Sequence, residues 1–129
     1  MPDADLTAEV SEFDIEVTNL SPSELDDQPF GIIRLDSSGR VLSYNAFEER
    51  LARRPRNEVV GKNFFLDVAP CTRVRGFYGR FLDGMARGSL RVRLGFVFEF
   101  EHGRREVEVS MLLADDASIW IIVRSDAPR

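Results

Sequence analysis

A long alternation of apolar and polar residues in the second half of this chain restricts its fold more than any other feature. Apolar side chains occupy every second position over residues 90–101, and the same period resumes over 107–113. A period of two is typical of a strand with one buried face. We therefore predict a long antiparallel hairpin with its turn at 102–104, then a turn at 115–116 and a last strand over 119–124.

The first half of the chain begins with a second hairpin. Residues 30–35 and 41–44 read as strands, and the cluster at 36–39 (Asp-Ser-Ser-Gly) is typical of a turn. Asn45 is a suitable N-cap for a short helix over 46–53.

Two further helices are expected before the long hairpin. Pro55 fits the first position of a short helix over 55–60, with Arg54 outside it. Three apolar side chains spaced four apart form one face of a longer helix that Gly88 ends: Phe77, Phe81 and Met85. The predicted fold is α+β, a five-stranded antiparallel sheet with helices packed on one face. This order of elements is similar to that of PAS domains, which form a cup over the sheet and usually hold a small ligand or a cofactor.

Charge is distributed unevenly along the 129 residues. Nine of the 22 acidic residues lie in 1–28, a segment without lysine or arginine. Because apolar residues interrupt this acidic leader, we predict that it is an N-terminal cap, and that 29–125 form the PAS domain. The surplus of arginine in the remainder is dispersed and lacks interleaved aromatic residues, so we expect no nucleic-acid binding.

Other features of the composition narrow the class of protein. No apolar run is long enough to cross a bilayer, and the N-terminus does not resemble a signal peptide, so we expect no membrane association. The single cysteine excludes an internal disulfide and a cysteine-rich zinc site. We expect a cytoplasmic protein with no metal site.

That cysteine, Cys71, lies at the end of an apolar segment and directly after a proline. Pro70 fixes its own φ and biases Ala69 toward an extended conformation, so Cys71 should lie in a stiffened loop at the edge of the core. We expect turns and one loose helical turn across 61–72. A structural thiol remains an open interpretation, because free cysteine is often buried as a small hydrophobe.

Two polar residues near the first hairpin are further candidates. Tyr44 ends the second predicted strand and Glu48 follows one helical turn later, so both side chains can point into the cup. The residues alone are equally compatible with a core tyrosine whose hydroxyl reaches the surface and with a solvated glutamate.

Six short segments together form a more specific pattern: Phe30-Gly31, Leu35-Asp36, Tyr44-Asn45-Ala46, Val60-Gly61-Lys62-Asn63-Phe64-Phe65, Asp67-Val68-Ala69-Pro70-Cys71-Thr72 and Phe77-Tyr78-Gly79. The chain resembles the photoactive yellow proteins, a family of blue-light receptors in the PAS superfamily. The likeness extends without a gap from about residue 30 to residue 124.

This resemblance implies a covalent cofactor. In that family the cysteine matching Cys71 carries p-coumaric acid (4-hydroxycinnamic acid) as a thioester. The residues matching Tyr44 and Glu48 donate hydrogen bonds to its phenolate, and the arginine matching Arg54 lies over the pocket. The resemblance also implies a pocket wall formed by Ile33, Phe64, Val68, Ala69, Pro70, Thr72, Phe98 and His102.

A mechanism follows from these residue types. A carboxyl donates a hydrogen bond only when protonated, and burial favours the protonated form. We expect light to isomerise the vinyl bond and Glu48 to give up its proton. A buried, unpaired carboxylate would then remain, and the domain would respond by local opening with release of the leader.

The sequence departs from the family pattern at several positions. Ala52 replaces a threonine that supports the tyrosine in the best-known member, and Phe96 and Phe100 stand where tyrosines are common. His102 aligns with a methionine that helps the chromophore return to its dark isomer. Two interpretations of His102 stay open: a solvated turn residue, or a lid over the chromophore whose charge changes near neutral pH.

Two other functions are compatible with the residues. One is a chromophore-free PAS module for protein–protein interaction. The other is an enzyme with Cys71 as nucleophile and His102 as base, which lacks an evident orienting group. We favour a non-enzymatic photoreceptor, a monomer or weak dimer, that signals to an unknown downstream protein.

Overall fold

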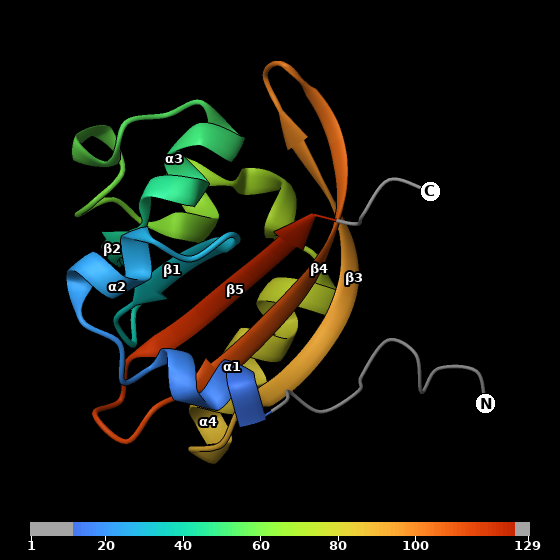
Figure 1. The fold of residues 1–129 in the computed structure, drawn as a ribbon. Helices are drawn as coiled ribbons and strands as arrows, with labels where there is room; N and C mark the ends of the chain where they lie inside the picture. The colour runs from blue at the N-terminus through green and yellow to red at the C-terminus, as the bar shows by residue number, and fades with distance from the viewer. Residues whose placement is uncertain (1–11, 126–129) are drawn as a thin grey trace.

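A five-stranded antiparallel sheet forms the centre of the protein (Figure 1). It is seen in a computed structural model that describes residues 12–125. The strand order is β2-β1-β5-β4-β3, so β5 joins the two hairpins by pairing with both β1 and β4. The strands are β1 (Gly31–Leu35), β2 (Val41–Tyr44), β3 (Arg91–Phe100), β4 (Gly103–Leu113) and β5 (Ile119–Ser125). All five predicted strands are confirmed.

The tip of the long hairpin is tighter than predicted. Phe100 pairs with Gly103, so the turn consists of Glu101 and His102 alone, instead of residues 102–104. Gly103 has a φ of 138°, which residues with a side chain rarely adopt. This backbone conformation allows β4 to begin directly after the two-residue turn.

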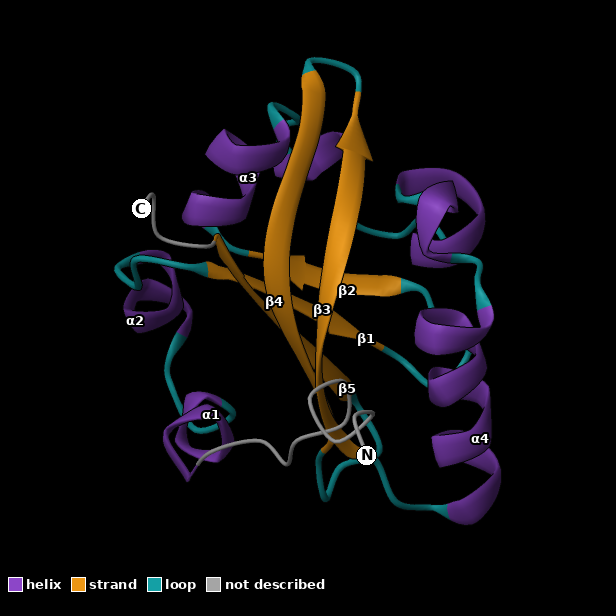
Figure 2. Cartoon of the chain, turned by 90° about the vertical axis from the view of Figure 1, so that its right-hand side faces the viewer, coloured by secondary structure: helices purple, strands orange, loops and turns teal. Residues whose placement is uncertain are grey.

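Helices and single helical turns cover both faces of the sheet. Figure 2 shows α1 and α2 on one side of β4 and β5, with α4 on the other side. The helices are α1 (Glu12–Val17), α2 (Pro22–Asp26), α3 (Ala46–Ala52) and α4 (Arg80–Arg87). The single turns are 3₁₀ at Arg56–Glu58 (η2) and Pro70–Thr72 (η4), and π-helical at Phe64–Val68 (η3) and Arg75–Gly79 (η5). No described helix has the length and apolar character needed to span a membrane.

Each sheet face has its own apolar core, and β5 contributes to both. Ile121 and Val123 point to the inner face, whose core includes α4 and a cluster of phenylalanine rings: Phe64, Phe65, Phe77 and Phe81. Trp120 and Ile122 point to the outer face, where Val17 and Leu25 of the leader are buried against them. The described part of the leader therefore packs on the sheet as a cap, and the fold class is confirmed.

Polar contacts also hold the leader to the sheet. Asp14 of α1 is buried, and it accepts hydrogen bonds from the Ser110 hydroxyl at 2.8 Å and from Arg124 Nη2 at 2.6 Å. The Arg124 guanidinium also lies 4.5 Å from the centre of the Phe30 ring. These contacts join α1 to β4 and β5. The proposed division at residue 28 stays a prediction.

Two further local predictions needed correction. Pro55 is the N-cap residue, with a ψ of 145°, and is not the first residue of a helix. Its turn is held against α3 because the Arg56 N–H donates to Glu49 Oε2 at 2.6 Å. The segment around Cys71 is more helical than predicted, since a π-helical turn and a 3₁₀ turn follow one another there.

Candidate functional site

A cavity of about 680 Å³ lies between the inner face of the sheet, α3 and the tip of the β3–β4 hairpin. Figure 1 shows α3 and the hairpin tip at the same end of the molecule. The cavity wall contains the only cysteine of the chain together with apolar and charged side chains: Tyr44, Glu48, Ala52, Arg53, Arg54, Glu58, Phe64, Asp67, Val68, Ala69, Pro70, Cys71, Phe98, Glu99, Phe100, Glu101 and His102.

Glu48, a residue of α3, is the most unusual residue of this wall, because its ionisable side chain is almost completely buried. Its Oε1 atom has no hydrogen-bond partner among the described residues. Burial raises the pKa of Glu48 to about 8, because desolvation penalises the carboxylate. A neutral carboxyl group that can donate a hydrogen bond therefore faces the cavity near neutral pH.

Tyr44 lies beside Glu48 in the same wall, at the end of β2. Burial raises the pKa of the Tyr44 hydroxyl far above its ordinary value, and the nearby charge of Glu48 acts in the same direction. The positive charge of Arg54 opposes this effect. Tyr44 is therefore a second neutral hydrogen-bond donor in the cavity.

Arg54 and Cys71 lie on the segments that close the cavity. The Arg54 Nη1 atom donates a hydrogen bond to the Val68 carbonyl at 3.0 Å, which ties the chain after α3 to the turn that precedes Cys71. Cys71 is half-buried and carries a free thiol in the 3₁₀ turn Pro70–Thr72. The thiol is thus held at a fixed place in the cavity wall.

His102 reaches the cavity from the hairpin turn. The residue is exposed, and its ring stacks on Phe100 with 5.1 Å between ring centres and 4° between ring planes. A solvated turn residue and a lid over the cavity are both compatible with this position. The role of His102 as a lid stays a prediction.

Ten of the twelve residues predicted for the site line this cavity, and two do not. Ile33 is completely buried in the inner core, where it pairs with Tyr44 across β1 and β2. Thr72 is also completely buried, and its hydroxyl donates to the Ala69 carbonyl at 2.6 Å. Thr72 therefore stabilises the turn that carries Cys71 but does not line the cavity.

Sequence reasoning missed most of the charged rim of the cavity. The charged lining residues that were not predicted are Arg53, Glu58, Asp67, Glu99 and Glu101. Ala52 and Phe100, two positions where the sequence departs from the family pattern, also line the cavity. Charged residues in turns and at strand ends usually face solvent, so their type and spacing gave no signal. Among the described residues no group of three or more His, Cys, Asp or Glu side chains is arranged to hold a metal ion.

A polar connection runs from Glu48 to the leader through Asn45. The Asn45 side-chain oxygen accepts from the backbone N–H groups of Glu48 at 3.1 Å and Ile32 at 2.9 Å. The Asn45 amide nitrogen donates to the carbonyls of Leu25 at 2.8 Å and Phe30 at 3.0 Å. One buried amide therefore joins the helix of Glu48 to the end of α2.

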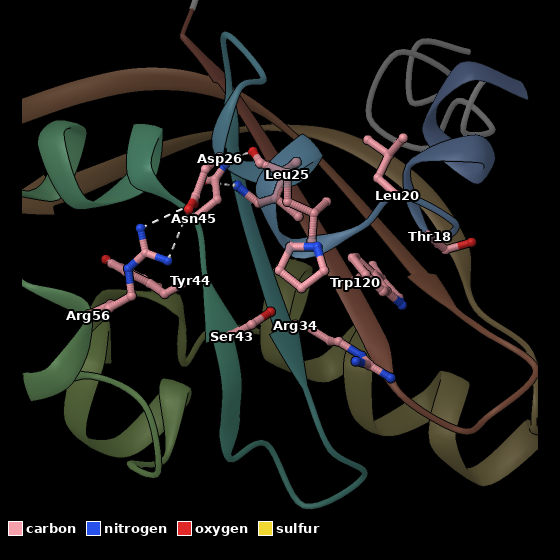
Figure 3. A pocket seen from close by; sticks show the side chains of 12 residues that line it. Thr18, Leu20, Leu25, Asp26, Arg34, Ser43, Tyr44, Asn45, Arg56 and Trp120 are labelled. Atoms are coloured by element: carbon pink, nitrogen blue, oxygen red, sulfur yellow. Dashed lines mark hydrogen bonds and ion pairs between the residues drawn. The ribbon is translucent and has the colours of Figure 1, made fainter.

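A second, smaller cavity of about 200 Å³ lies on the outer side, between the leader and the sheet (Figure 3). Trp120 and Arg34 form part of its wall, with the Arg34 guanidinium 5.1 Å from the indole centre. At its other end Arg56 bridges Asp26 of α2 and Glu49 of α3, each at 3.1 Å. Cys71 does not line this second cavity. The cavity therefore marks the place where the leader packs on the sheet, and it is separate from the site of the thiol.

The sheet, the helices and the inner cavity together define a PAS domain. The family model described as the PAS fold matches residues 22–124. Among solved structures, the photoactive yellow protein domain of the sensor histidine kinase Ppr from Rhodospirillum centenum is similar, with a TM-score of 0.81 and 40% sequence identity. That match covers 85% of this chain and 97% of the solved chain.

Two similar proteins indicate which family within the PAS fold the chain resembles. A photoactive yellow protein of Halochromatium salexigens is 46% identical over 115 residues, covering 86% of this chain and 91% of the relative. Another, of Rhodothalassium salexigens, is 41% identical with the same coverage of both chains. The chain belongs to the photoactive yellow protein family of PAS-type sensors.

Proposed function

We propose that this protein is a blue-light photoreceptor that holds p-coumaric acid as a thioester on Cys71. The observation that carries the proposal is a neutral, buried carboxyl group, Glu48, in the same cavity as the only thiol of the chain. The cavity of about 680 Å³ is within the range of about 300–1,000 Å³ usual for small-ligand pockets. The proposed protein is a receptor without enzymatic activity, and its thiol would stay reduced in the cytoplasm.

The residues of the cavity fit the chemistry of such a group. The Cys71 thiolate would attack the carbonyl carbon of an activated p-coumarate such as its anhydride, and the activating group would leave with its electron pair as the thioester forms. Tyr44 and Glu48 would each donate a hydrogen bond to the phenolate oxygen, because a buried anion without donors is very costly. When bound, p-coumaric acid supplies absorption of blue light and isomerisation of its vinyl bond.

Glu48 is the proposed proton donor. Its carboxyl keeps its proton at neutral pH because burial raises the pKa to about 8. After Glu48 gives up this proton, its carboxylate remains in a place where Oε1 has no partner among the described residues. Removing such a buried charge from water has an effective cost of several kcal/mol, which is a large part of the stability of a small domain.

The leader is the part of the domain that we propose to open. Asn45 bonds the Glu48 N–H and also the Leu25 carbonyl of α2, so a movement of the first turn of α3 loosens the attachment of α2. The Asp26 carboxylate accepts from the Ala46 N–H at 2.8 Å, which adds a second link between the same helices. The surface exposed in this way would contact an unknown downstream protein.

The proposal is tested by an absorption spectrum of the purified protein after incubation with p-coumaric anhydride, with Cys71→Ser as the matched control. We expect a visible band that bleaches in blue light and returns in the dark, and no band in Cys71→Ser. Folded wild-type protein without a band would overturn the proposal in favour of a chromophore-free PAS interaction module. Infrared difference spectra should show loss of a protonated carboxyl band on illumination.

A further inference from the structure

The strand next to Glu48 contains a recess at Gly31. Gly31 is buried in β1 and pairs with Val123 of β5. It points to the same inner face as Ile33 and Leu35, whose large side chains fill the core at the two following inward positions. Glycine in a strand interior often marks a place where another group approaches closely.

The carboxyl group of Glu48 occupies this recess. A Cβ atom added at Gly31 would overlap Glu48 Oε1 and would lie 3.1 Å from Glu48 Cδ. Gly31 is not among the glycines with a positive φ, so backbone freedom does not explain the residue. The close approach of the Glu48 side chain does.

The rest of Glu48 is fixed independently of the recess. Its backbone N–H is bonded to Asn45, the N-cap of α3, and its own Cβ would stay 3.4 Å from the added atom. A side chain at position 31 would therefore displace only the end of the Glu48 side chain. The displaced carboxyl group would move into the cavity that Glu48 already lines.

We propose that Gly31 is a positioning residue for Glu48. The recess holds Oε1 against the strand, where it has no donor among the described residues, and this leaves the other carboxyl oxygen to face the cavity. In the neutral carboxyl, the unpaired Oε1 is then the carbonyl oxygen and the second oxygen carries the proton. An effect of Gly31 on proton donation to a chromophore rests on the proposed function. The placement of the Glu48 carboxyl in the recess does not.

The first test is the infrared C=O band of Glu48 in the chromophore-free full chain below neutral pH, identified by its loss in Glu48→Gln. In Gly31→Ala we expect this band at lower wavenumber, because the displaced carbonyl oxygen gains hydrogen bonds from cavity water. Gly95→Ala is the matched control, since Gly95 is also a strand glycine but an added Cβ meets nothing within 4 Å. An unchanged band in Gly31→Ala, or no Glu48 band in the wild type, would overturn the proposal.

The second test is a comparison of thermal unfolding midpoints in two backgrounds. Gly31→Ala should lower the midpoint of the wild type by at least about 3 °C. In a Glu48→Ala background the same change should leave the midpoint unchanged or raise it, because alanine is otherwise favoured over glycine in a strand. An equal decrease in both backgrounds would contradict the recess.

Neither test requires the chromophore. A protein that fails to take up p-coumaric acid would therefore overturn the proposed function and leave the role of Gly31 open to confirmation. If Gly31→Ala alone does not fold, recovery of folding in the Gly31→Ala/Glu48→Ala double variant would support the proposal. Failure of both to fold would refute it.

Discussion

Replacing Glu48 by glutamine should remove a large part of the pH dependence of folding stability. Burial raises the pKa of this carboxyl from 4.5 to about 8 in the folded protein, whereas the unfolded chain exposes it. Between these two pKa values the folded state binds a proton that the unfolded state has released. The contribution to stability is thus fully present below about pH 4.5 and is lost as the pH rises through about 8.

The size of this effect follows from the pKa difference. Each unit of difference corresponds to about 1.4 kcal/mol, so the rise from 4.5 to about 8 corresponds to about 5 kcal/mol. A typical small domain is stable by about 5–15 kcal/mol. The free-energy cost of ionising this one carboxyl is therefore comparable to the free energy of unfolding of the whole domain.

The assay is urea unfolding of the chromophore-free wild type and of Glu48→Gln at intervals of one pH unit from about pH 5 to pH 8. Glutamine is close to glutamate in size and uncharged at every pH. All other titrating groups are present in both proteins, so their contributions cancel in the difference between the two free energies of unfolding. That difference should change in favour of Glu48→Gln by about 1.4 kcal/mol per pH unit. A difference that stays constant across this range would refute the reasoning.

Two further predictions concern the leader and the hairpin turn. Asp14→Ala removes the carboxylate that accepts hydrogen bonds from Arg124 and Ser110. We expect the free energy of unfolding to fall by about 1–3 kcal/mol and amide hydrogen exchange in α1 to become faster. The control Asp115→Ala, in an exposed turn, should change neither quantity. Unchanged exchange in α1 of Asp14→Ala would contradict the role of these Asp14 contacts in holding the leader to the sheet. If His102 is a lid, dark recovery after illumination should depend on pH near neutrality and lose this dependence in His102→Ala; a flat profile in the wild type would exclude this role.

Strand positions were predictable because they depend on local patterns. The alternation that begins at Leu90 reappears in β3 as inward-facing apolar residues, and Asn45 caps α3 as its residue type suggested. Gly88 ends α4 with a φ of 74°, in agreement with the prediction. In each case the information lies within one element and its immediate neighbours.

Contacts between distant segments could not be read in the same way. Nothing near Asp14 in the sequence indicates Arg124, which follows 110 positions later. One loose helical turn was expected within 61–72, but its π-helical form at Phe64–Val68 was not, because the packing of its phenylalanine rings against Phe77 and Phe81 leaves no periodic pattern.

The candidate site shows the same limit. Tyr44 and Glu48 were ordinary residues by type and spacing, and only the family resemblance singled them out. The buried carboxyl of Glu48 in α3 lies close to Gly31 of β1, a separate element, and no local pattern indicates this approach. The charged rim includes Glu99 near the end of β3 and Glu101 in the turn that follows, and charge at such positions usually signals no more than solvent exposure.

The position of Trp120 beneath the leader gives the protein a built-in optical reporter. It is the only tryptophan in the chain, and it is 4% exposed in the outer core beside Leu25. Indole emission shifts to longer wavelength when the ring becomes hydrated. All tryptophan emission of this protein comes from this one residue. Detachment of the leader could therefore be followed by intrinsic fluorescence in real time, without a label and without altering the inner cavity.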